Sequence, residues 1–363
     1  MTQDAPPPAE PEIHFTRQNG ALIITLDRPR ALNALSLGMI EGMDAALAAA
    51  AADPAVACVL IEGRGGRAFC AGGDIRSVGQ ALRAGVGEAF GVAMFRGEYT
   101  LNHRIRTFPK PFIALVDGIV MGGGVGVSIH GSHRIVSERA SFAMPETGIG
   151  LFPDVGMTYL LPRSPGELGL YAGLTGAKLG APDAKLIGYA THIVPSGRFE
   201  ALRAALIARA PQRAEEVDGV LAGFATRFGP AELVRRRPVI DRCFGQGSME
   251  AIVAALAAEG SEWARVTAEG LAGRSPTSLK LALRAFRAAR SLDFETCLAT
   301  EFRMSIHCLA AHDLEEGVRA LLIDKDMKPA WRPATLDAVR DSDLDSYFMP
   351  LAVADLACAK APA

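Results

Sequence analysis

PFIALVDGIVMGGGVG, residues 111–126, is the stretch that decides the fold of this chain. An apolar run of this kind is typical of a buried strand, and the glycines after it allow a tight turn and the close approach of a ligand to bare backbone. If a helix starts there, its free N–H groups stabilise negative charge that develops on a carbonyl oxygen. FAMPETGIGLFPDVG (142–156) follows and brings the carboxylates Glu146 and Asp154. Together these features predict an enzyme of acyl-transfer or enolate chemistry.

Strand-like and helix-like segments alternate around this stretch. The alternation predicts an α/β fold with a mostly parallel sheet that helices cover on both faces. In such sheets the functional loops lie beyond the carboxyl ends of the strands. Strands are expected at 21–27, 56–63, 112–120 and 133–137, and helices at 36–52, 88–107 and 123–131.

The pattern changes along the chain and divides it into three parts. The first twelve residues, MTQDAPPPAEPE, are Pro-rich and acidic and predict a disordered tail at 1–12. A core at 13–196 carries the strands and the candidate site. From residue 197 onward, helical segments follow one another without a convincing strand, which predicts a helical C-terminal region at 197–363. The pattern leaves open whether this region is a separate domain or a layer packed on the sheet.

Composition and charge exclude several classes of function. The chain has 363 residues, of which 49% are hydrophobic, so it can bury a sizeable core. Its net charge of −2 gives no reason to expect nucleic acid or an anionic membrane as a partner. No apolar run reaches the length of a membrane span, and no signal or transit pattern opens the sequence, so we predict a cytoplasmic location. Its six cysteines lack C-x-x-C spacing, which argues against a disulfide framework and a thiolate zinc site.

Two glycine-rich loops follow predicted strands, GRGGRAFCAGGDI (63–75) and DGIVMGGGVG (117–126). Neither matches the dinucleotide or P-loop pattern. Each loop alone is typical of an ordinary tight turn. Two such loops at one sheet edge, each with free N–H groups, predict an oxyanion hole.

The two carboxylates also allow an ordinary structural interpretation. Asp154 could cap a short helix, and Glu146 could be a loop residue bonded to backbone. Their neighbours Phe142, Met144 and Phe152 are apolar, however, and an apolar setting raises the pKa of a carboxyl group and excludes water. This setting favours a catalytic role.

Serine-hydrolase and metal chemistry find little support. Ser128 and His130 lack the G-x-S-x-G pattern, and residues two apart on a helix point in different directions. The pairs His130 with His133 and His307 with His312 lack H-E-x-x-H spacing and a third ligand. We therefore expect no metal.

At these loops the chain resembles the crotonase (enoyl-CoA hydratase/isomerase) superfamily. The resemblance implies a spiral of ββα repeats, a coenzyme A thioester substrate, and a thioester oxygen held by two backbone N–H groups, here those of Gly73 and Gly123. The motifs that carry it are LDRPRALNAL (26–35), AFCAGGDI (68–75), PKPFIALVDGIVMGGGVG (109–126) and FAMPETGIGLFPDVG (142–156).

One position departs from the hydratases of that superfamily. Hydratases carry a catalytic Glu three residues after the oxyanion-hole glycine and a second Glu in the Pro-Glu turn. The first position is Gly126 here, and the second is Glu146. Gly126 cannot carry a proton, so ordinary hydratase activity should be weak.

The sequence is more similar to the 3-hydroxyisobutyryl-CoA hydrolase branch. The segments that carry this likeness are 121–163, 292–305 and 312–333, so it reaches almost the whole chain. It implies Glu146 and Asp154 as the catalytic pair. Glu98, Gly123, Glu146 and Asp154 would form the substrate-binding set. Glu146 would act as nucleophile or general base, a choice that the sequence leaves open.

A local basic set surrounds the first loops: Arg28, Arg30, Arg67 and Arg76. Such a set usually marks a solvated surface, and phosphate contacts are the alternative. By likeness to crotonases, Arg30 and Arg76 would bind the coenzyme A phosphates.

The resemblance also sets expectations for partners and rivals. Coenzyme A is part of the substrate, so we expect no further cofactor. Crotonase relatives form trimers or hexamers, and the C-terminal helices could instead leave a monomer. The rival functions are an enoyl-CoA hydratase or isomerase of the same fold and a non-catalytic acyl-CoA-binding subunit.

Overall fold

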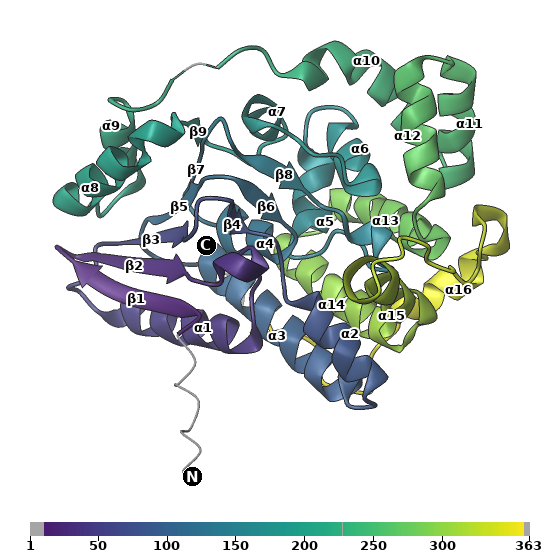
Figure 1. The fold of residues 1–363 in the computed structure, drawn as a ribbon, viewed down its shortest axis with the longest axis horizontal. Coiled ribbons are helices and arrows are strands. Elements are labelled where there is room, and N and C mark those ends of the chain that lie inside the picture. The colour runs from purple at the N-terminus through teal and green to yellow at the C-terminus, as the bar shows by residue number, and fades with distance from the viewer. Residues whose placement is uncertain (1–10, 227, 359–363) are drawn as a thin grey trace, which may run out of the picture.

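The computed structural model describes residues 11–226 and 228–358 (Figure 1). The predicted tail at 1–12 lies outside these residues except for Pro11 and Glu12. Glu12 accepts a backbone hydrogen bond from Asp27 at 2.8 Å, and its carboxylate pairs with Arg28 at 2.8 Å. Glu12 therefore contacts the loop that directly follows β2.

A six-stranded sheet forms the larger of two sheets, in the order β1-β2-β3-β5-β7-β9. Only β1 and β2 are antiparallel, and the other neighbours are parallel, as the β–α–β rhythm predicts. The strands are β1 (Ile13–Gln18), β2 (Ala21–Leu26), β3 (Cys58–Gly63), β5 (Phe112–Val116), β7 (His133–Val136) and β9 (His192–Ile193).

A second sheet of three short parallel strands, in the order β4-β6-β8, lies beside the first. These strands are β4 (Ala68–Cys70), β6 (Ile119–Met121) and β8 (Ser141–Ala143). Each one follows a strand of the larger sheet, so the chain repeats a strand in one sheet, a strand in the other and then helix or loop. This is the spiral of ββα repeats that the resemblance implies.

The single strand predicted at 112–120 is wrong, because the chain breaks between β5 and β6 at Asp117 and Gly118. Gly118 has a φ of +93°, and a Cβ there would lie 2.4 Å from the carbonyl oxygen of Arg67. Only glycine fits this turn. The break carries the chain from the large sheet into the small one and so places the glycine loop on the small sheet.

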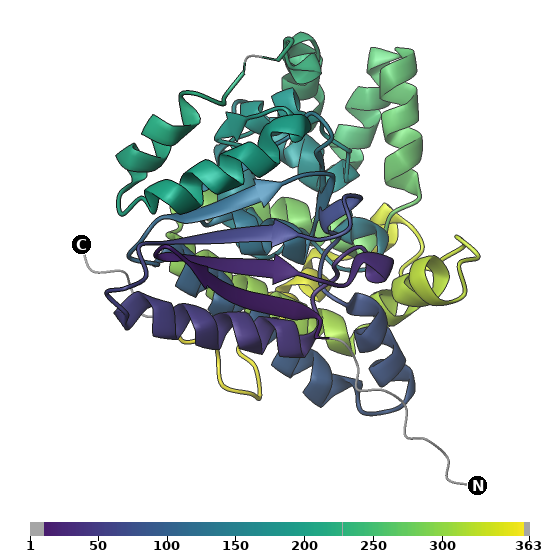
Figure 2. The same ribbon diagram turned by 60° about the vertical axis from the view of Figure 1, so that its left-hand side comes forward.

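Helices cover both faces of the large sheet. On one face, alternate residues of the central strands pack with α8 and α9 (Figure 2). The other face packs on α1, α3 and the small sheet. The helices of the first half are α1 (Leu37–Ala52), α2 (Ile75–Arg83), α3 (Gly87–Arg106), α4 (Gly123–Ile129), α5 (Met157–Leu160), α6 (Leu168–Thr175) and α7 (Ala181–Leu186).

The helical C-terminal region packs on this framework. Helices α13 and α14 contact α6 and α3, and their apolar residues join the same hydrophobic core as the sheet. Helices α13 and α14 thus pack on the core that contains the sheet, and the division of the chain into parts at residue 197 stays a prediction. Its helices are α8 (Phe199–Arg209), α9 (Ala214–Leu221), α10 (Glu232–Phe244), α11 (Met249–Glu259), α12 (Glu262–Ala272), α13 (Pro276–Ala288), α14 (Phe294–Ala310), α15 (His312–Val318) and α16 (Asp341–Asp345), with a π-helix at Arg319–Ile323. Within residues 11–226 and 228–358, no helix is long and apolar enough to cross a membrane.

Candidate active site

A cavity of about 240 Å³ lies beyond the carboxyl ends of the three short strands. The structure brings together here five residues that the sequence singled out: Gly73, Glu98, Gly123, Glu146 and Asp154. Both glycine loops contribute to its wall, one after β4 and the other after β6. The rest of the wall is mostly apolar, with Phe95, Ile149 and Leu151 among the lining residues. Such a setting excludes water and strengthens electrostatic interactions.

Two backbone amides face the same part of this cavity. Gly123 is the first residue of α4, so its N–H has no partner within the helix. On either side of Gly73, the Gly72 carbonyl and the Asp74 N–H bond to Leu35, and the Gly73 N–H has no acceptor among the described residues. A Cβ on Gly123 would lie 2.9 Å from the Gly73 nitrogen, so the two amides lie close together. Two free N–H groups this close together are suited to an oxyanion hole.

Three buried carboxyl groups share the cavity. Glu98, Glu146 and Asp154 are 4%, 5% and 4% exposed. Among the residues that the structure describes, Glu98 Oε1 and Glu146 Oε2 have no hydrogen-bond partner. Asp154 Oδ2 accepts a hydrogen bond from the Tyr99 hydroxyl at 2.5 Å. The Asp154 side chain does not cap α5, whose N-cap residue is Gly156, so the capping interpretation does not describe this site.

Burial raises the pKa of all three carboxyl groups. The pKa of Asp154 rises to about 6, and the Tyr99 hydrogen bond opposes the rise. The pKa of Glu98 rises to about 8, and that of Glu146 rises well above its usual value, in both cases through burial first and the charge of Asp154 second. A charge on Asp154 thus disfavours ionisation of both Glu98 and Glu146.

The turn that carries Glu146 is held from the C-terminal region. Glu146 begins a 3-10 turn, Glu146–Gly148, directly after Pro145. Arg274, which precedes α13, donates hydrogen bonds to the carbonyl oxygens of Pro145, at 3.1 Å, and of Thr175. The positive charge of Arg274 lowers the pKa of Glu146 and so opposes the effect of burial. Sequence reasoning missed both Arg274 and Tyr99. Tyr99 could have been noticed because it directly follows Glu98, whereas no sequence signal marks Arg274.

No room is left for a second catalytic carboxylate at Gly126. A Cβ at this position would lie 2.8 Å from Val155 Cβ and 2.9 Å from Asn102 Nδ2. The volume that a longer side chain would need is thus already occupied. This agrees with the departure from hydratases seen in the sequence.

The predicted phosphate contacts lie outside the cavity. Arg30 belongs to the 3-10 turn Pro29–Ala31, and Arg76 lies in the first turn of α2. Both are exposed, and neither has an ion-pair partner within the described ranges. Arg28 differs, because its guanidinium pairs with Glu12 and Asp74. Arg30 and Arg76 are therefore free to meet an anionic ligand.

The side chains of Ser128, in α4, and His130, directly after it, bond to other parts of the fold. The Ser128 hydroxyl donates to the Gly124 carbonyl at 2.9 Å and bonds with Tyr189 at 2.9 Å. His130 Nε2 bonds to the Val155 carbonyl at 2.8 Å. Within the described part of the chain, no group of three or more side chains is suited to hold a metal ion. The expectation of no metal stays a prediction.

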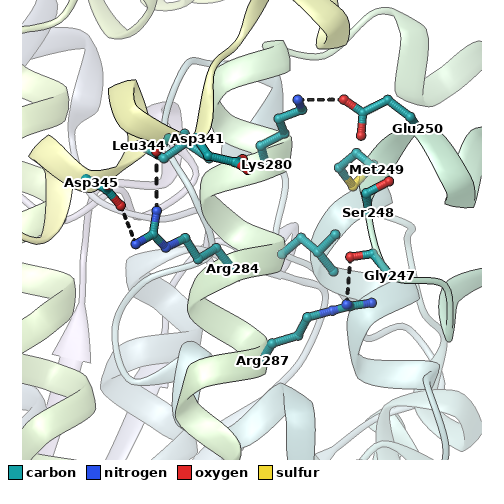
Figure 3. A pocket seen from close by; sticks show the side chains of 11 residues that line it. Gly247, Ser248, Met249, Glu250, Lys280, Arg284, Arg287, Asp341, Leu344 and Asp345 are labelled. Carbon is teal, nitrogen blue, oxygen red and sulfur yellow. Dashed lines mark hydrogen bonds and ion pairs between the residues drawn. The ribbon is translucent and has the colours of Figure 1, made fainter.

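A larger cavity, of about 460 Å³, lies between α11, α13 and α16 (Figure 3). Its three cations come from α13, and each has a partner. The pairs are Lys280 with Glu250 at 2.5 Å, Arg284 with Asp345 at 2.6 Å, and Arg287 with the Gly247 carbonyl at 2.8 Å. Each of these cations has a partner, and the cavity offers no buried carboxylate without a partner among the described residues. It is therefore a weaker candidate for a catalytic site.

Comparisons with known proteins show the family of this chain. A family model described as enoyl-CoA hydratase/isomerase matches residues 21–348. Among solved structures, a carnitinyl-CoA dehydratase from Mycobacterium thermoresistibile has a TM-score of 0.90 and 40% identity, covering 96% of this chain and 99% of its own. An enoyl-CoA hydratase from Rhodobacter sphaeroides 2.4.1 has a TM-score of 0.89 and 39% identity, covering 96% of this chain and 100% of its own. The chain belongs to the enoyl-CoA hydratase/isomerase family, the crotonase superfamily.

Relatives within the family bear a more specific name. A protein of Xenopus tropicalis named 3-hydroxyisobutyryl-CoA hydrolase, mitochondrial, is 45% identical over 95% of this chain and 90% of its own length. The protein of the same name from Rattus norvegicus is 43% identical over 95% and 90%. These likenesses confirm the resemblance to the hydrolase branch. The names place those relatives in mitochondria, so the cytoplasmic prediction for this chain is not confirmed.

Proposed function

We propose that this chain is an acyl-CoA thioester hydrolase that cleaves 3-hydroxyisobutyryl-CoA, a step of valine breakdown. The observation that carries the proposal is the juxtaposition, in one apolar cavity, of the free amides of Gly73 and Gly123 with the buried carboxyl of Glu146. The relatives named for this activity support it. No cofactor is needed, because coenzyme A arrives as part of the substrate.

The chemistry follows from the groups present. With the thioester oxygen between the two amides, attack on the carbonyl carbon forms a tetrahedral oxyanion that both N–H groups stabilise. Removal of one such donor costs about 3–4 kcal/mol of activation energy. Glu146 either attacks to form an anhydride that water then cleaves, or accepts a proton from the attacking water. In both routes the C–S bond breaks, the thiol of coenzyme A leaves and the acyl group departs as a carboxylate.

Both routes require an ionised Glu146 at the moment of reaction. Because burial and the charge of Asp154 raise the pKa of Glu146, its proton must leave before attack. We therefore expect the rate to rise with pH at values above the ordinary titration range of a glutamate. Arg274 favours the ionised form, and Asp154 orients the water or the substrate hydroxyl.

Glu98 supplies selectivity in this proposal. Its protonated carboxyl faces the cavity with an unpartnered oxygen and would bond the 3-hydroxyl group of the substrate. A substrate without that hydroxyl leaves a buried polar group unpaired, which costs about 1–3 kcal/mol. Isobutyryl-CoA should therefore be a poorer substrate than its 3-hydroxy analogue.

A second candidate is an enoyl-CoA hydratase or dehydratase. The descriptions of the two solved structures that are 39% and 40% identical favour it. Addition of water across a C=C bond uses two carboxylates in hydratases, and the position of one is Gly126 here, which Asn102 and Val155 enclose. A third candidate, a non-catalytic acyl-CoA binder, does not account for unpaired buried carboxyl groups, which cost stability.

One pair of assays tests the proposal. Thiol release from 3-hydroxyisobutyryl-CoA is measured beside the loss of enoyl absorbance from crotonyl-CoA, with isobutyryl-CoA as the control without a hydroxyl. We expect rapid thiol release and slow enoyl loss. Enoyl loss without thiol release would favour the hydratase, and binding without either reaction would favour the non-catalytic subunit.

The remaining parts of the proposal concern the coenzyme A contacts, the location in the cell and the oligomeric state. We infer that Arg30 and Arg76 bind the phosphates of coenzyme A and that the chain works in the cytoplasm. Charge removal at either arginine should raise KM for acyl-CoA and leave turnover at saturation nearly unchanged. A measurement of mass in solution distinguishes a monomer from a trimer or a hexamer. Cell fractionation tests the location.

A further inference from the structure

A turn in an unusual backbone conformation carries Asp154 into the cavity. Val155, the next residue, has a φ of +54°, and Gly156 has a φ of +84°. A β-branched residue such as valine rarely adopts the left-handed region, and it does so only where the surroundings hold it there. The direction of the Asp154 side chain thus depends on whatever fixes this turn.

Helix α14 and His130 hold this turn, and His130 Nε2 bonds to the Val155 carbonyl at 2.8 Å. Glu301 is fully buried, its Oε2 accepts the Gly156 N–H at 2.6 Å, and its Oε1 accepts the Thr158 N–H at 2.9 Å. The Thr158 hydroxyl also donates to Oε1. Among the described residues, Glu301 pairs with no arginine, lysine or histidine. Burying a carboxyl group without a cation is costly, and here three hydrogen-bond donors, all in the segment that follows Asp154, offset part of that cost.

One helical turn further along α14, Ser305 acts on Asp154 indirectly, through the hydroxyl of Tyr99. Its hydroxyl lies 2.6 Å from the Tyr99 hydroxyl, which in turn donates to Asp154 Oδ2 at 2.5 Å. Tyr99 and Ser305 are both fully buried. The Tyr99 ring packs on Phe95 and Phe302, with ring centroids 5.9 and 6.4 Å apart. These contacts leave the hydroxyl little freedom to turn away from Asp154.

We propose that Glu301, Ser305 and Tyr99 are positioning residues for the hydrolytic reaction: Glu301 holds the turn that aims Asp154, and Tyr99, itself bonded to Ser305, orients its carboxylate through a hydrogen bond. This inference rests on the proposed function for its catalytic consequence. Its structural part, the hold on Asp154, is independent of the reaction.

Several other groups bear on the charge of Asp154. Glu98 on α3 and Glu146 on its turn face it across the cavity, and Glu301 and Cys308 on α14 lie near enough for its charge to raise their pKa values. All of these are acidic groups, and ionisation of any one disfavours a charge on Asp154. The Tyr99 hydroxyl is the side-chain donor that favours it. Loss of this donor should therefore raise the pKa of Asp154.

The first test compares two buried tyrosines. Tyr99→Phe removes only the hydroxyl, and Tyr189→Phe is the matched control, because Tyr189 is equally buried but bonds Ser128 and does not line the cavity. The Asp154 carboxyl is titrated in the full chain by NMR with carboxyl-labelled aspartate, and Asp154→Asn identifies its signal. We expect a higher pKa in Tyr99→Phe and an unchanged pKa in Tyr189→Phe. An unchanged pKa in Tyr99→Phe, or equal shifts in both variants, would overturn the inference.

The second test uses turnover. In Tyr99→Phe the kcat should fall, because Asp154 loses the hydrogen bond that orients it, with KM for 3-hydroxyisobutyryl-CoA changed less than twofold. Glu301→Ala should lower kcat tenfold or more, and Glu301→Gln should recover part of the loss, because its carbonyl oxygen still accepts one of the two N–H groups. Wild-type kcat in a folded Glu301→Ala protein would contradict the role of Glu301.

The two readouts separate the inference from the proposed function. If the wild-type protein releases no thiol from acyl-CoA, the hydrolase proposal fails, and the titration still decides whether Tyr99 sets the charge of Asp154. If thiol release is rapid and the titration shows no effect of Tyr99, the inference fails alone.

Discussion

Two cavities of this molecule differ in whether their charged groups have partners. The first holds Glu98, Glu146 and Asp154, and the second lies between α11, α13 and α16. In the first, three acidic groups lie buried together, and two of their oxygens lack partners among the described residues. In the second, each cation of α13 meets a carboxylate or a carbonyl oxygen near the surface. The second cavity is larger, so volume is a poor guide to chemistry here. What distinguishes the first is uncompensated burial, which costs stability and makes protons available for transfer.

The largest effect on turnover is expected at Glu146, in the first cavity. We expect Glu146→Gln to lower turnover of 3-hydroxyisobutyryl-CoA by about a thousandfold or more, because the amide can neither attack nor accept a proton. Glu250→Gln, in the other cavity, is the control and should leave turnover unchanged. Steady-state thiol release measures both, and binding of the acyl-CoA should persist in both. Normal turnover in Glu146→Gln would remove this residue from the mechanism.

A second substitution tests whether the cavity could hold the missing carboxylate. Gly126→Glu should destabilise the protein by about 1–3 kcal/mol or more, because its side chain would enter space that Asn102 and Val155 occupy. It should not create rapid hydration of crotonyl-CoA. In Gly219→Ala, the control, the new methyl group meets no atom within 4 Å, and stability should not fall. Denaturant unfolding and enoyl absorbance provide the measurements, and efficient hydration by Gly126→Glu would revive the hydratase assignment.

The cost of uncompensated burial is measurable at Glu98. Because its pKa is about 8 in the folded protein and near 4.5 in the unfolded chain, folding becomes less favourable as pH rises between these values. Glu98→Gln cannot ionise, so its stability relative to wild type should grow from about pH 4.5 to pH 8 and then level off, reaching on the order of a few kcal/mol. Unfolding free energies measured across this range give the answer. A difference that stays constant with pH would show that Glu98 titrates normally in the folded protein.

The smallest effect is expected in the compensated cavity. Arg284→Gln breaks an ion pair with Asp345 whose side chains are 42% and 62% exposed, so the loss of stability should be about 0.5 kcal/mol or less. Turnover should equal that of the wild type. A large loss of turnover would mean that this cavity takes part in the reaction and that the contrast between the two cavities is misplaced.

Much of the fold and of the cavity wall could be predicted from the sequence. The strands β2, β3 and β7 and the helices α1, α3 and α4 lie within two residues of their predicted bounds, because long apolar runs and helical periodicity are local signals. The glycine loops and the pair of Glu146 and Asp154 stand out for the same reason. The strand β1 was missed, since its mostly exposed residues form no apolar run, and the short strands β4, β8 and β9 were missed, since strands of two or three residues carry no periodicity of their own.

The contacts that tune the cavity could not be predicted in this way. Arg274 holds the Glu146 turn from 129 residues further along the chain, and Glu301 holds the Asp154 turn from 145 residues away. Nothing in the local pattern around these residues distinguishes them from other charged residues on helices. Their partners are set by how α13 and α14 pack on the core.

The sequence by itself determined the α/β architecture, the family and the residues whose chemistry suits a thioester, since each of these depends on residue type and spacing along the chain. Only the tertiary structure decided which carboxyl groups have raised pKa values, which oxygens lack partners and why Gly126 admits no acidic side chain. These properties depend on burial and on charges brought together from distant segments, and a pKa or a free volume exists only once that packing is complete.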